Sequence, residues 1–278
     1  ANDTISWYEN ISFDFGDAPT SYPVTTADDG ARHRTVGPSL GDNRDSESNG
    51  VHSTDASADD STGSPDDEDG VTFSGSIVVS TSMALTGSVD VNLQNADGTS
   101  NRLDAWIDWN RDGDWGDADE QIITNFDLGT ANGVQTLNFT IPQKTGDNVV
   151  VGASFARFRV STAGSLAQTG AANDGEVEDH PVTITTDATP PVLTSFVRQT
   201  PSGPSTNADS LVFRVTFDED VSGVDAADFA VTGTTGAISS VAVVSASVYD
   251  VTVSGGDLAG LNGTVGLNLG GSQNVVDL

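Results

Sequence analysis

Short runs of alternating apolar and polar residues, rich in β-branched side chains, recur along most of the chain. Gly, Asp, Asn and Ser separate these runs, whereas a helical period of apolar residues is nearly absent. Alternation with a period of two is typical of half-buried strands, and the separating residues favour turns. The pattern therefore predicts an all-β protein built from sandwiches. The expected strands are 84–93, 103–109, 134–141, 149–160, 181–186, 211–217, 241–244, 248–253 and 264–269.

Residues 14–70 break this pattern. They are rich in Asp, Ser and Gly, and their few apolar anchors are Phe13, Phe15, Tyr22, Val36, Leu40 and Val51. A stretch of this length without regular structure is typical of a functional or a disordered segment, and dense acidic residues favour disorder when no metal is bound. We therefore expect long acidic loops that calcium orders.

A domain boundary is expected near residues 185–191. The Pro190–Pro191 pair follows a predicted strand, and adjacent prolines force an extended backbone and end a sheet ladder. The 278 residues are sufficient for two domains. The sequence thus predicts a first domain over 1–187 and a second over 188–278, which has the length and strand number of an immunoglobulin-like sandwich.

The chain is strongly acidic, with 41 Asp and Glu against 10 Lys and Arg and a formal net charge of −31. Such a chain repels nucleic acid and anionic lipid, which excludes both as partners. Two explanations of the acidity stay open and are compatible, namely specific calcium sites and the surface of a protein adapted to high salt. The chain has no cysteine, so metal ions are the natural alternative to disulfides. No run of 18 apolar residues occurs, so no membrane insertion is expected, and both ends suggest a segment of a longer polypeptide.

The clearest chemical motif lies at residues 108–120. Its first half reads D-x-N-x-D-G, in which side chains one, three and five of a tight loop converge on one point and the glycine, Gly113, permits the sharp turn. Hard oxygen ligands in this arrangement suit calcium. Strand-like sequences flank the loop, so it is not a helix–loop–helix hand; a metal-free hairpin is the alternative. The expected ligands are Asp108, Asn110, Asp112, the carbonyl of Asp114, and a closing carboxylate that is either Asp119 or Glu120.

Three tryptophans surround this loop, at positions 106, 109 and 115. Aromatic rings beside a calcium site form a platform for sugar or peptide in some proteins, but core packing is the more common use. Trp106 shares a strand face with Asp104, and Ala105 shares the other face with Ile107. At least one of these faces is expected to point outward.

Two further acidic groups permit metal binding less specifically. Asp67 and Asp69 belong to the acidic run 66–69, and further acidic residues lie near in sequence at 59–60, Asp42, Asp45 and Glu47. The run 66–69 is either a set of metal ligands or a group of solvated surface charges. Glu176 and Glu178 share one face of a strand, as Arg157 and Arg159 do of another. Acidic and basic ladders on neighbouring strands would neutralise each other, and metal ligation by the two glutamates is the alternative.

Several strings of residues occur in one order along the chain, namely 14–19 with Ser21–Tyr22, 29–33, Leu40–Gly41, 67–71, 106–110, 156–159 and 175–179. Together they resemble the GEVED domain of secreted bacterial proteins, over about residues 10–186. One departure is His180, where Tyr is more usual in that family.

The resemblance implies a secreted or cell-surface bacterial protein, because such domains occur in large repeat-containing surface proteins and as accessories to secreted hydrolases. The arrangement is also similar to the calcium-dependent peptide-binding module of giant RTX-type adhesins. That similarity implies a calcium ion that helps to hold a partner's peptide, with Asp29, Arg32 and His33 as candidate ligand-binding residues in the 14–70 loops. The second domain is similar to bacterial Ig-like repeats, in which linker calcium would involve Asp187, Asp218 and Asp220.

The sequence contains no motif match that indicates an active site. Residues 37–41 match G-x-S-x-G but lack the strand before it and the helix after it that this motif requires. The histidines at 33, 52 and 180 lack zinc spacing, and carboxylate pairs chosen from 41 acidic residues are uninformative. We therefore expect a protein that is not an enzyme.

The first functional hypothesis is a calcium-dependent adhesion segment that binds a peptide or protein on another cell, or alternatively a glycan. Its other contacts would be neighbouring domains of the same long chain. Two alternatives stay open. One is a calcium-stiffened structural spacer of a surface protein, and the other is an accessory or carbohydrate-binding module of a secreted hydrolase.

Overall fold

The structure, a computed structural model, describes residues 12–58, 67–81, 83–187, 189–203, 205–271 and 273–277. The chain divides into two compact units, the first made of Ala1–Val79 and Ala84–Thr186 and the second of Ser80–Met83 and Asp187–Leu278. The described residues form strands and 3-10 turns but no α-helix, which confirms the all-β prediction. Among them no helix is long and apolar enough to cross a membrane.

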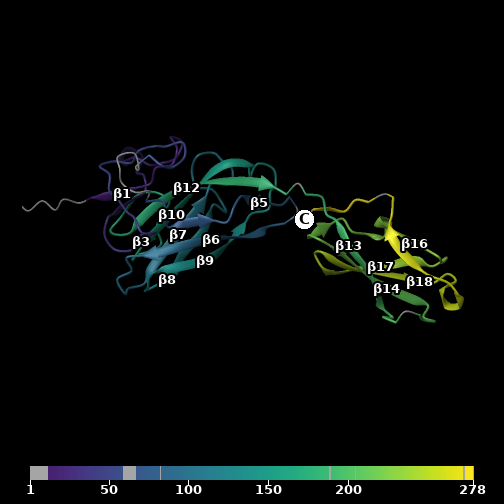
Figure 1. The fold of residues 1–278 in the computed structure, drawn as a ribbon. Helices are drawn as coiled ribbons and strands as arrows, with labels where there is room; N and C mark the ends of the chain where they lie inside the picture. Colours follow the sequence, from purple (N-terminus) through teal and green to yellow (C-terminus); the bar gives the residue numbers. More distant parts are fainter. Residues whose placement is uncertain are drawn as a thin grey trace, which may run out of the picture. The chain divides into compact units, whose positions relative to one another are not determined.

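Unit 1 contains two main sheets and a smaller third one (Figure 1). The first sheet is five-stranded, in the order β5 (Ile77–Val79), β12 (Glu176–Thr186), β10 (Gly152–Ser161), β7 (Asn101–Ile107) and β8 (Gln121–Gly129). The second contains β3 (Ser39–Leu40), β6 (Leu85–Gln94) and β4 (Val71–Phe73), with β9 (Gly133–Ile141) also paired to β6. The third consists of β1 (Phe13–Phe15), β2 (Arg32–Arg34) and β11 (Ala171–Ala172).

The two main sheets share one apolar core, because alternate residues of each strand point into the space between them. β6 and β9 supply the apolar side of one sheet, and β7 and β10 supply that of the other. In β6 and β9 the period-two pattern of the sequence is also the pattern of burial. The central members of this core are Val89, Val91, Leu93, Leu103, Ala105, Ile107, Leu137, Phe139, Ile141, Ala156, Phe158 and Val160.

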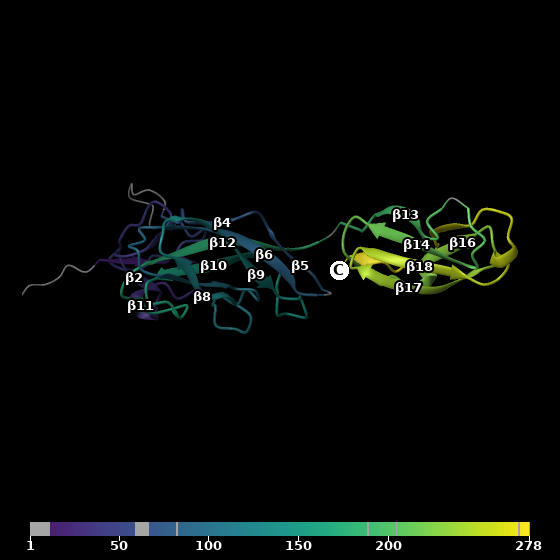
Figure 2. The same ribbon diagram turned by 90° about the horizontal axis from the view of Figure 1, so that it is seen from below.

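The outer face of the five-stranded sheet is also covered, so the expectation that one face of residues 104–107 points outward is wrong. Asp104 and Trp106 are 0% and 3% exposed although they lie opposite the core. The N-terminal segment 12–58, purple in Figures 1 and 2, lies at one end of the unit near β10 and β12. Its residues Tyr22 and Val24 form a separate small core with Trp106 and Trp115. Few apolar side chains are needed to hold the N-terminal segment, because this face of the sheet also carries buried polar groups that bind the segment.

A buried ion pair between β10 and β12 provides the strongest of these polar contacts. Arg157 donates from Nε to Asp179 Oδ1 at 2.7 Å and from Nη2 to Oδ2 at 2.6 Å, and both side chains are fully buried. The amide of Ala18 donates to the same Asp179 Oδ2 at 2.9 Å, and Arg157 Nη1 donates to the carbonyl of Pro23 at 3.0 Å. A Cβ at Gly16 would lie 2.5 Å from Asp179 Oδ2, so only glycine permits this close approach.

The segment predicted as long loops is only partly regular. Its described part contains β1, β2, β3 and a 3-10 turn over Thr26–Asp28, with loops between them. Phe15, Tyr22 and Leu40 are buried as predicted, whereas Val36 and Val51 are 55% and 51% exposed and do not anchor it. Positions 59, 60 and 66 of the acidic runs lie outside the described residues.

Unit 2 has a four-stranded antiparallel sheet in the order β13 (Leu193–Thr200), β14 (Ser210–Phe217), β18 (Val248–Ser254) and β17 (Ala237–Ser245), which is visible in Figure 2. Two short pairs complete it, β15 (Val221–Ser222) with β20 (Val276–Asp277) and β16 (Phe229–Thr232) with β19 (Gly266–Leu269). Its 3-10 turns are Ala226–Asp228 and Leu258–Gly260. One apolar core joins these elements, and its assignment as an Ig-like repeat stays a prediction.

The predicted linker residues of unit 2 lie in an acidic neighbourhood. Asp218 Oδ1 accepts the amide of Val192 at 2.7 Å, and Asp220 is exposed. Partial burial raises the pKa of Glu219, and the charges of Asp277, Asp187 and Asp218 raise it further. Calcium binding by Asp187, Asp218 and Asp220 stays a prediction.

Replacing Arg157 with Met leaves Asp179 as a buried charge without its partner. We expect unit 1 to lose about 3–5 kcal/mol of unfolding free energy, the usual cost of breaking a buried pair. Residues 187–278 contain no tryptophan, and the described Trp106, Trp109 and Trp115 lie in unit 1, so tryptophan fluorescence during urea unfolding measures this loss. The control is Arg102→Met, which removes an exposed pair with Asp127 at 3.4 Å and is expected to cost about 1 kcal/mol or less. Equal losses in the two variants would contradict the anchoring role of Arg157.

Candidate metal centre

The acidic loop 108–120 connects two neighbouring strands of the five-stranded sheet. β7 ends at Ile107 and β8 begins at Gln121, and the pair of strands is antiparallel. The amide of Ile107 donates to the carbonyl of Glu120 at 2.9 Å, which brings the two ends of the loop together. Asp108 and Glu120 are therefore neighbours because the hairpin closes between them.

Three carboxylates converge inside this loop, those of Asp108, Asp112 and Glu120. One oxygen of each lies within 4.8 Å of the others. Asp108 and Glu120 are 0% and 1% exposed, whereas Asp112 is exposed to solvent. The group is therefore anchored on its inner side and open on its outer side. Hereafter we call it the loop triad.

Hydrogen bonds fix the two buried carboxylates. Asp108 Oδ2 accepts from the Tyr22 hydroxyl at 2.6 Å and from the Gly113 amide at 3.1 Å. Glu120 Oε2 accepts the Asp117 amide at 2.9 Å, while Glu120 Oε1 is buried without a hydrogen-bond partner. A buried, unsatisfied carboxylate oxygen is costly unless a cation or a proton satisfies it. The loop triad thus fits a hard cation, for which carboxylate oxygens are the preferred ligands.

The pKa shifts in the loop triad also favour a bound cation. Burial raises the pKa of Glu120 from its ordinary 4.5 to about 8, and the charges of Asp108, Asp112 and Asp117 contribute to the increase. Burial also raises the pKa of Asp108, although hydrogen bonds from Tyr22 and two backbone amides oppose this. Without a cation, Asp108 and Glu120 therefore hold protons more tightly than they do in water.

The other predicted loop ligands have different positions. Asn110 accepts the Asp112 amide at 3.0 Å and donates to Asp117 Oδ2 at 2.6 Å, so it braces the loop. Asp114 is exposed and accepts the Gly116 amide at 2.7 Å. Asp119 is exposed, and its carbonyl accepts Trp109 Nε1 at 2.9 Å. Of the two candidates for the closing carboxylate, the structure places Glu120 in the triad and Asp119 outside it.

The aromatic residues near the loop are packed rather than presented to solvent. Trp109 and Trp115 are 1% and 2% exposed, and Trp115 Nε1 donates to the Phe155 carbonyl at 3.1 Å. The Arg157 guanidinium lies 4.2 Å above the Trp115 ring. Gly113 has a φ of +94°, as the turn required, and a Cβ there would lie 2.5 Å from Ser21 Cβ. The loop is therefore packed against the N-terminal segment.

A second group of three carboxylates lies elsewhere in unit 1 and consists of Asp14, Asp67 and Glu176. We call it the inner triad. Asp67 and Glu176 were predicted from the sequence as metal ligands in two separate groups. Asp14, the third member, was not identified as a ligand from the sequence. Asp69 lies outside it and accepts from Asn43 Nδ2 at 2.6 Å. Glu178 also lies outside it, held by the Gly70 amide at 2.9 Å and His180 Nε2 at 2.8 Å.

Comparison with known protein families identifies a domain within unit 1. The family model of the GEVED domain matches residues 102–183, from β7 to within β12. Residues 102–183 are a GEVED domain. A comparison with curated proteins finds no match. The GEVED domain contains the whole loop triad and Glu176, whereas Asp14, Asp67 and Tyr22 precede it.

The register of the GEVED domain overturns the expected pairing of its basic and acidic ladders. Phe158 lies opposite Glu178 and Arg157 lies opposite Asp179, so the arginines and the glutamates project from opposite faces of the sheet. Glu176 and Glu178 lie on the core side, and Arg157 pairs with Asp179 on the outer side. Arg159 donates from Nε to His33 Nε2 at 3.0 Å. A shift of one residue in register decides such pairings, and the alternation within each strand, taken separately, does not reveal which residues lie opposite each other.

The three residues expected to bind ligand do not form one exposed surface. His33 is 0% exposed, and its Nδ1 lies 2.8 Å from the Asp174 carbonyl while Nε2 accepts from Arg159. Burial holds the pKa of His33 well below its usual range, and the charge of Arg159 lowers it further. Asp29 is exposed and accepts from Arg32 Nη1 at 3.1 Å. Of the three, Asp29 and Arg32 alone remain accessible.

A cavity of about 540 Å³ lies at the start of β8 and the end of β9, and two of its lining residues flank Glu120 of the loop triad in the sequence. Asp119 and Gln121 connect it to the loop. Its lining is mostly polar, which suits a peptide or another hydrogen-bonding ligand better than an apolar one. The remaining lining residues are Ala84, Ile122, Thr140, Pro142, Gln143, Thr145 and Asn148.

Glu120→Gln and Asp119→Asn form a matched pair for testing which acid closes the loop. We expect Glu120→Gln to weaken calcium binding at least about tenfold, or about 1.4 kcal/mol, because it removes a buried charged ligand. Asp112→Ala is expected to act in the same direction. Asp119→Asn should bind calcium as the parent does. Isothermal titration with calcium measures the difference, and equal binding by Glu120→Gln and the parent would contradict the assignment.

The raised pKa of Glu120 predicts a pH dependence in metal-free protein. Between its ordinary pKa of 4.5 and its folded value of about 8, the unfolded chain has released a proton that the folded chain retains. Stability should therefore fall as the pH rises from about 5 to about 8. Glu120→Gln should remove this part of the fall, which urea unfolding of parent and variant at several pH values measures. Parallel curves for the two proteins would show that Glu120 does not contribute.

Proposed function

We propose that this chain is a calcium-dependent ligand-binding segment of a secreted or cell-surface bacterial protein and that it mediates adhesion. The ligand class that fits best is a peptide or protein on another cell, and no catalytic role is proposed. The GEVED domain at residues 102–183 supports this proposal at the level of domain type.

The observation that carries this proposal is the one-sided exposure of the loop triad. Asp108 and Glu120 would hold a calcium ion from the protein side, while Asp112 lies at the surface. Calcium takes six to eight oxygen ligands, so three carboxylates leave positions that water or an incoming oxygen fills. A carbonyl or a terminal carboxylate of a peptide is such an oxygen, and the adjacent polar cavity offers space for the rest of the ligand.

The proposal is tested with peptides that differ only at the C-terminus, one with a free carboxylate and one amidated. Binding to an array should require calcium, disappear with chelator, and favour the free carboxylate. Glu120→Gln should lose binding, whereas Asp127→Asn, a change at an exposed acidic residue of β8, should retain it. Binding that is equally strong in chelator would contradict the proposal.

A structural spacer is the second candidate, and the complete burial of the inner triad favours it. A spacer needs bound cations but no exchangeable ligand. It predicts calcium-dependent melting with no peptide or glycan bound at any calcium concentration. Binding of glycans alone would instead indicate the accessory module of a hydrolase.

A further inference from the structure

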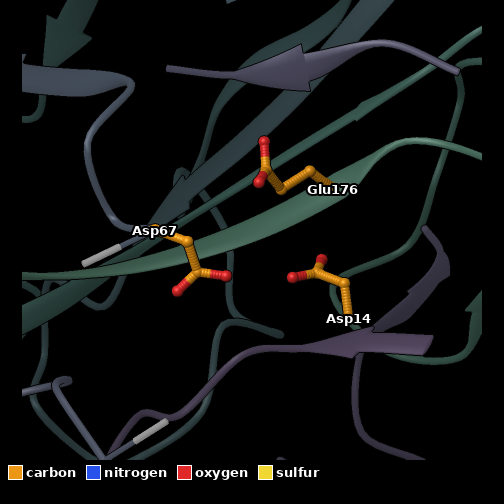
Figure 3. Close-up of side chains that lie close together, drawn as sticks. All are labelled: Asp14, Asp67 and Glu176. Carbon is orange, nitrogen blue, oxygen red and sulfur yellow. The ribbon is translucent and has the colours of Figure 1, made fainter. Parts of the chain in front are cut away.

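The inner triad differs from the loop triad in its burial. Asp14, Asp67 and Glu176 are 1%, 4% and 0% exposed. They come from three separate segments, namely β1, the residues before β4, and the start of β12. Figure 3 shows their side chains extending into the same space, and one oxygen of each lies within 4.8 Å of the others. Solvent therefore does not screen the charges of this group.

A main-chain amide from another segment holds each of these carboxylates in place. Val177 donates its N–H to Asp14 Oδ2 at 2.8 Å, and Asp45 donates to Asp67 Oδ2 at 3.2 Å. The Leu40 N–H donates to Glu176 Oε2. The other oxygen of Glu176, Oε1, is buried and has no hydrogen-bond partner. A preorganised group of buried carboxylates with an unsatisfied oxygen is characteristic of a ligand site rather than of a chance acidic cluster.

The charge around the inner triad is unbalanced. Burial raises the pKa of Asp14, and the charges of Asp67 and Glu47 raise it further. Burial likewise raises the pKa of Glu176, and Asp14 and Glu178 add to this. Arg44 is close enough to oppose these effects, but it donates to the carbonyls of residues 37, 38 and 175. The group thus requires either bound protons or an added cation.

We propose that Asp14, Asp67 and Glu176 bind a divalent cation of the calcium class in a closed structural site. This site fastens β1 and the segment before β4 to the start of β12. An all-carboxylate ligand set selects hard cations over zinc or copper. The role is distinct from that of the loop triad, because a fully buried ion has no position for an exchangeable ligand.

Glu176→Gln tests this site, and Glu178→Gln is its matched control. Gln keeps an oxygen for the Leu40 amide but removes the charge. Glu178 lies on the same strand and the same face, is 1% exposed, and lies outside the triad. Native mass spectrometry in calcium should show one ion fewer in Glu176→Gln than in the parent and an unchanged number in Glu178→Gln. Glu120→Gln should lose a different ion, so the double variant Glu120→Gln/Glu176→Gln should lose both.

Thermal unfolding provides a readout that a simple packing role would not give. In metal-free buffer Glu176→Gln should be at least as stable as the parent, because one of three repelling carboxylates is neutral. In calcium it should gain less stability than the parent. An equal gain in calcium, together with an unchanged ion number, would overturn the proposal.

Asp14→Asn is the second variant and decides the matter if Glu176→Gln does not fold, because its amide oxygen still accepts from Val177. A measurement on the parent protein is independent of both variants. Tb³⁺ that replaces the cations should show two luminescence lifetimes, the longer from a buried ion with few water ligands. A single lifetime typical of a hydrated ion would overturn the proposal.

Discussion

A carboxylate buried in unit 1 must be stabilised by an opposite charge or by hydrogen-bond donors, and this requirement organises the structure. Two like charges 4 Å apart repel each other by about 4 kcal/mol at the effective dielectric near a protein surface, a large part of the roughly 5–15 kcal/mol that stabilises a domain. Asp179 is neutralised by Arg157. Asp104 instead accepts the amides of Asn125 and Leu166 at 2.8 and 3.0 Å. The two triads have neither solution in full, so protons or cations must supply the missing charge.

The N-terminal segment connects the Arg157–Asp179 pair and the two triads. The Arg157–Asp179 pair holds the amide of Ala18, and a few residues later the Tyr22 hydroxyl donates to Asp108 in the loop triad. The inner triad holds the same segment at Asp14. The GEVED domain therefore supplies most of the charged groups, but residues that precede it complete the inner triad and cover part of the outer face of its sheet.

Much of the fold could be predicted from the sequence, because several long strands, such as β6, β9, β14 and β18, carry a local period-two pattern. Burial does not alternate regularly in β8 and β13, and these strands were not predicted. The loop triad was also accessible, since the spacing of Asp108 and Asp112 is local and hairpin closure then selects Glu120. The inner triad was not, because β1 has only three residues and Asp14 meets Glu176 through tertiary packing. The predicted pairing of Arg157 and Arg159 with the two glutamates of β12 was wrong for a similar reason. A one-residue choice of register places Asp179, not Glu178, opposite Arg157.

Exposure determines what a bound ion in each triad can do. An ion held by the inner triad has no accessible ligand position, so its binding energy can contribute only to folding. An ion held by the loop triad has protein oxygens on one side and solvent on the other, so a partner's oxygen can replace water there. The two roles are nevertheless linked, because the segment that the inner triad holds at Asp14 carries Tyr22 to Asp108. Neutralising the inner triad, as in Glu176→Gln, should therefore weaken calcium binding at the loop triad, although the two triads have no residue in common.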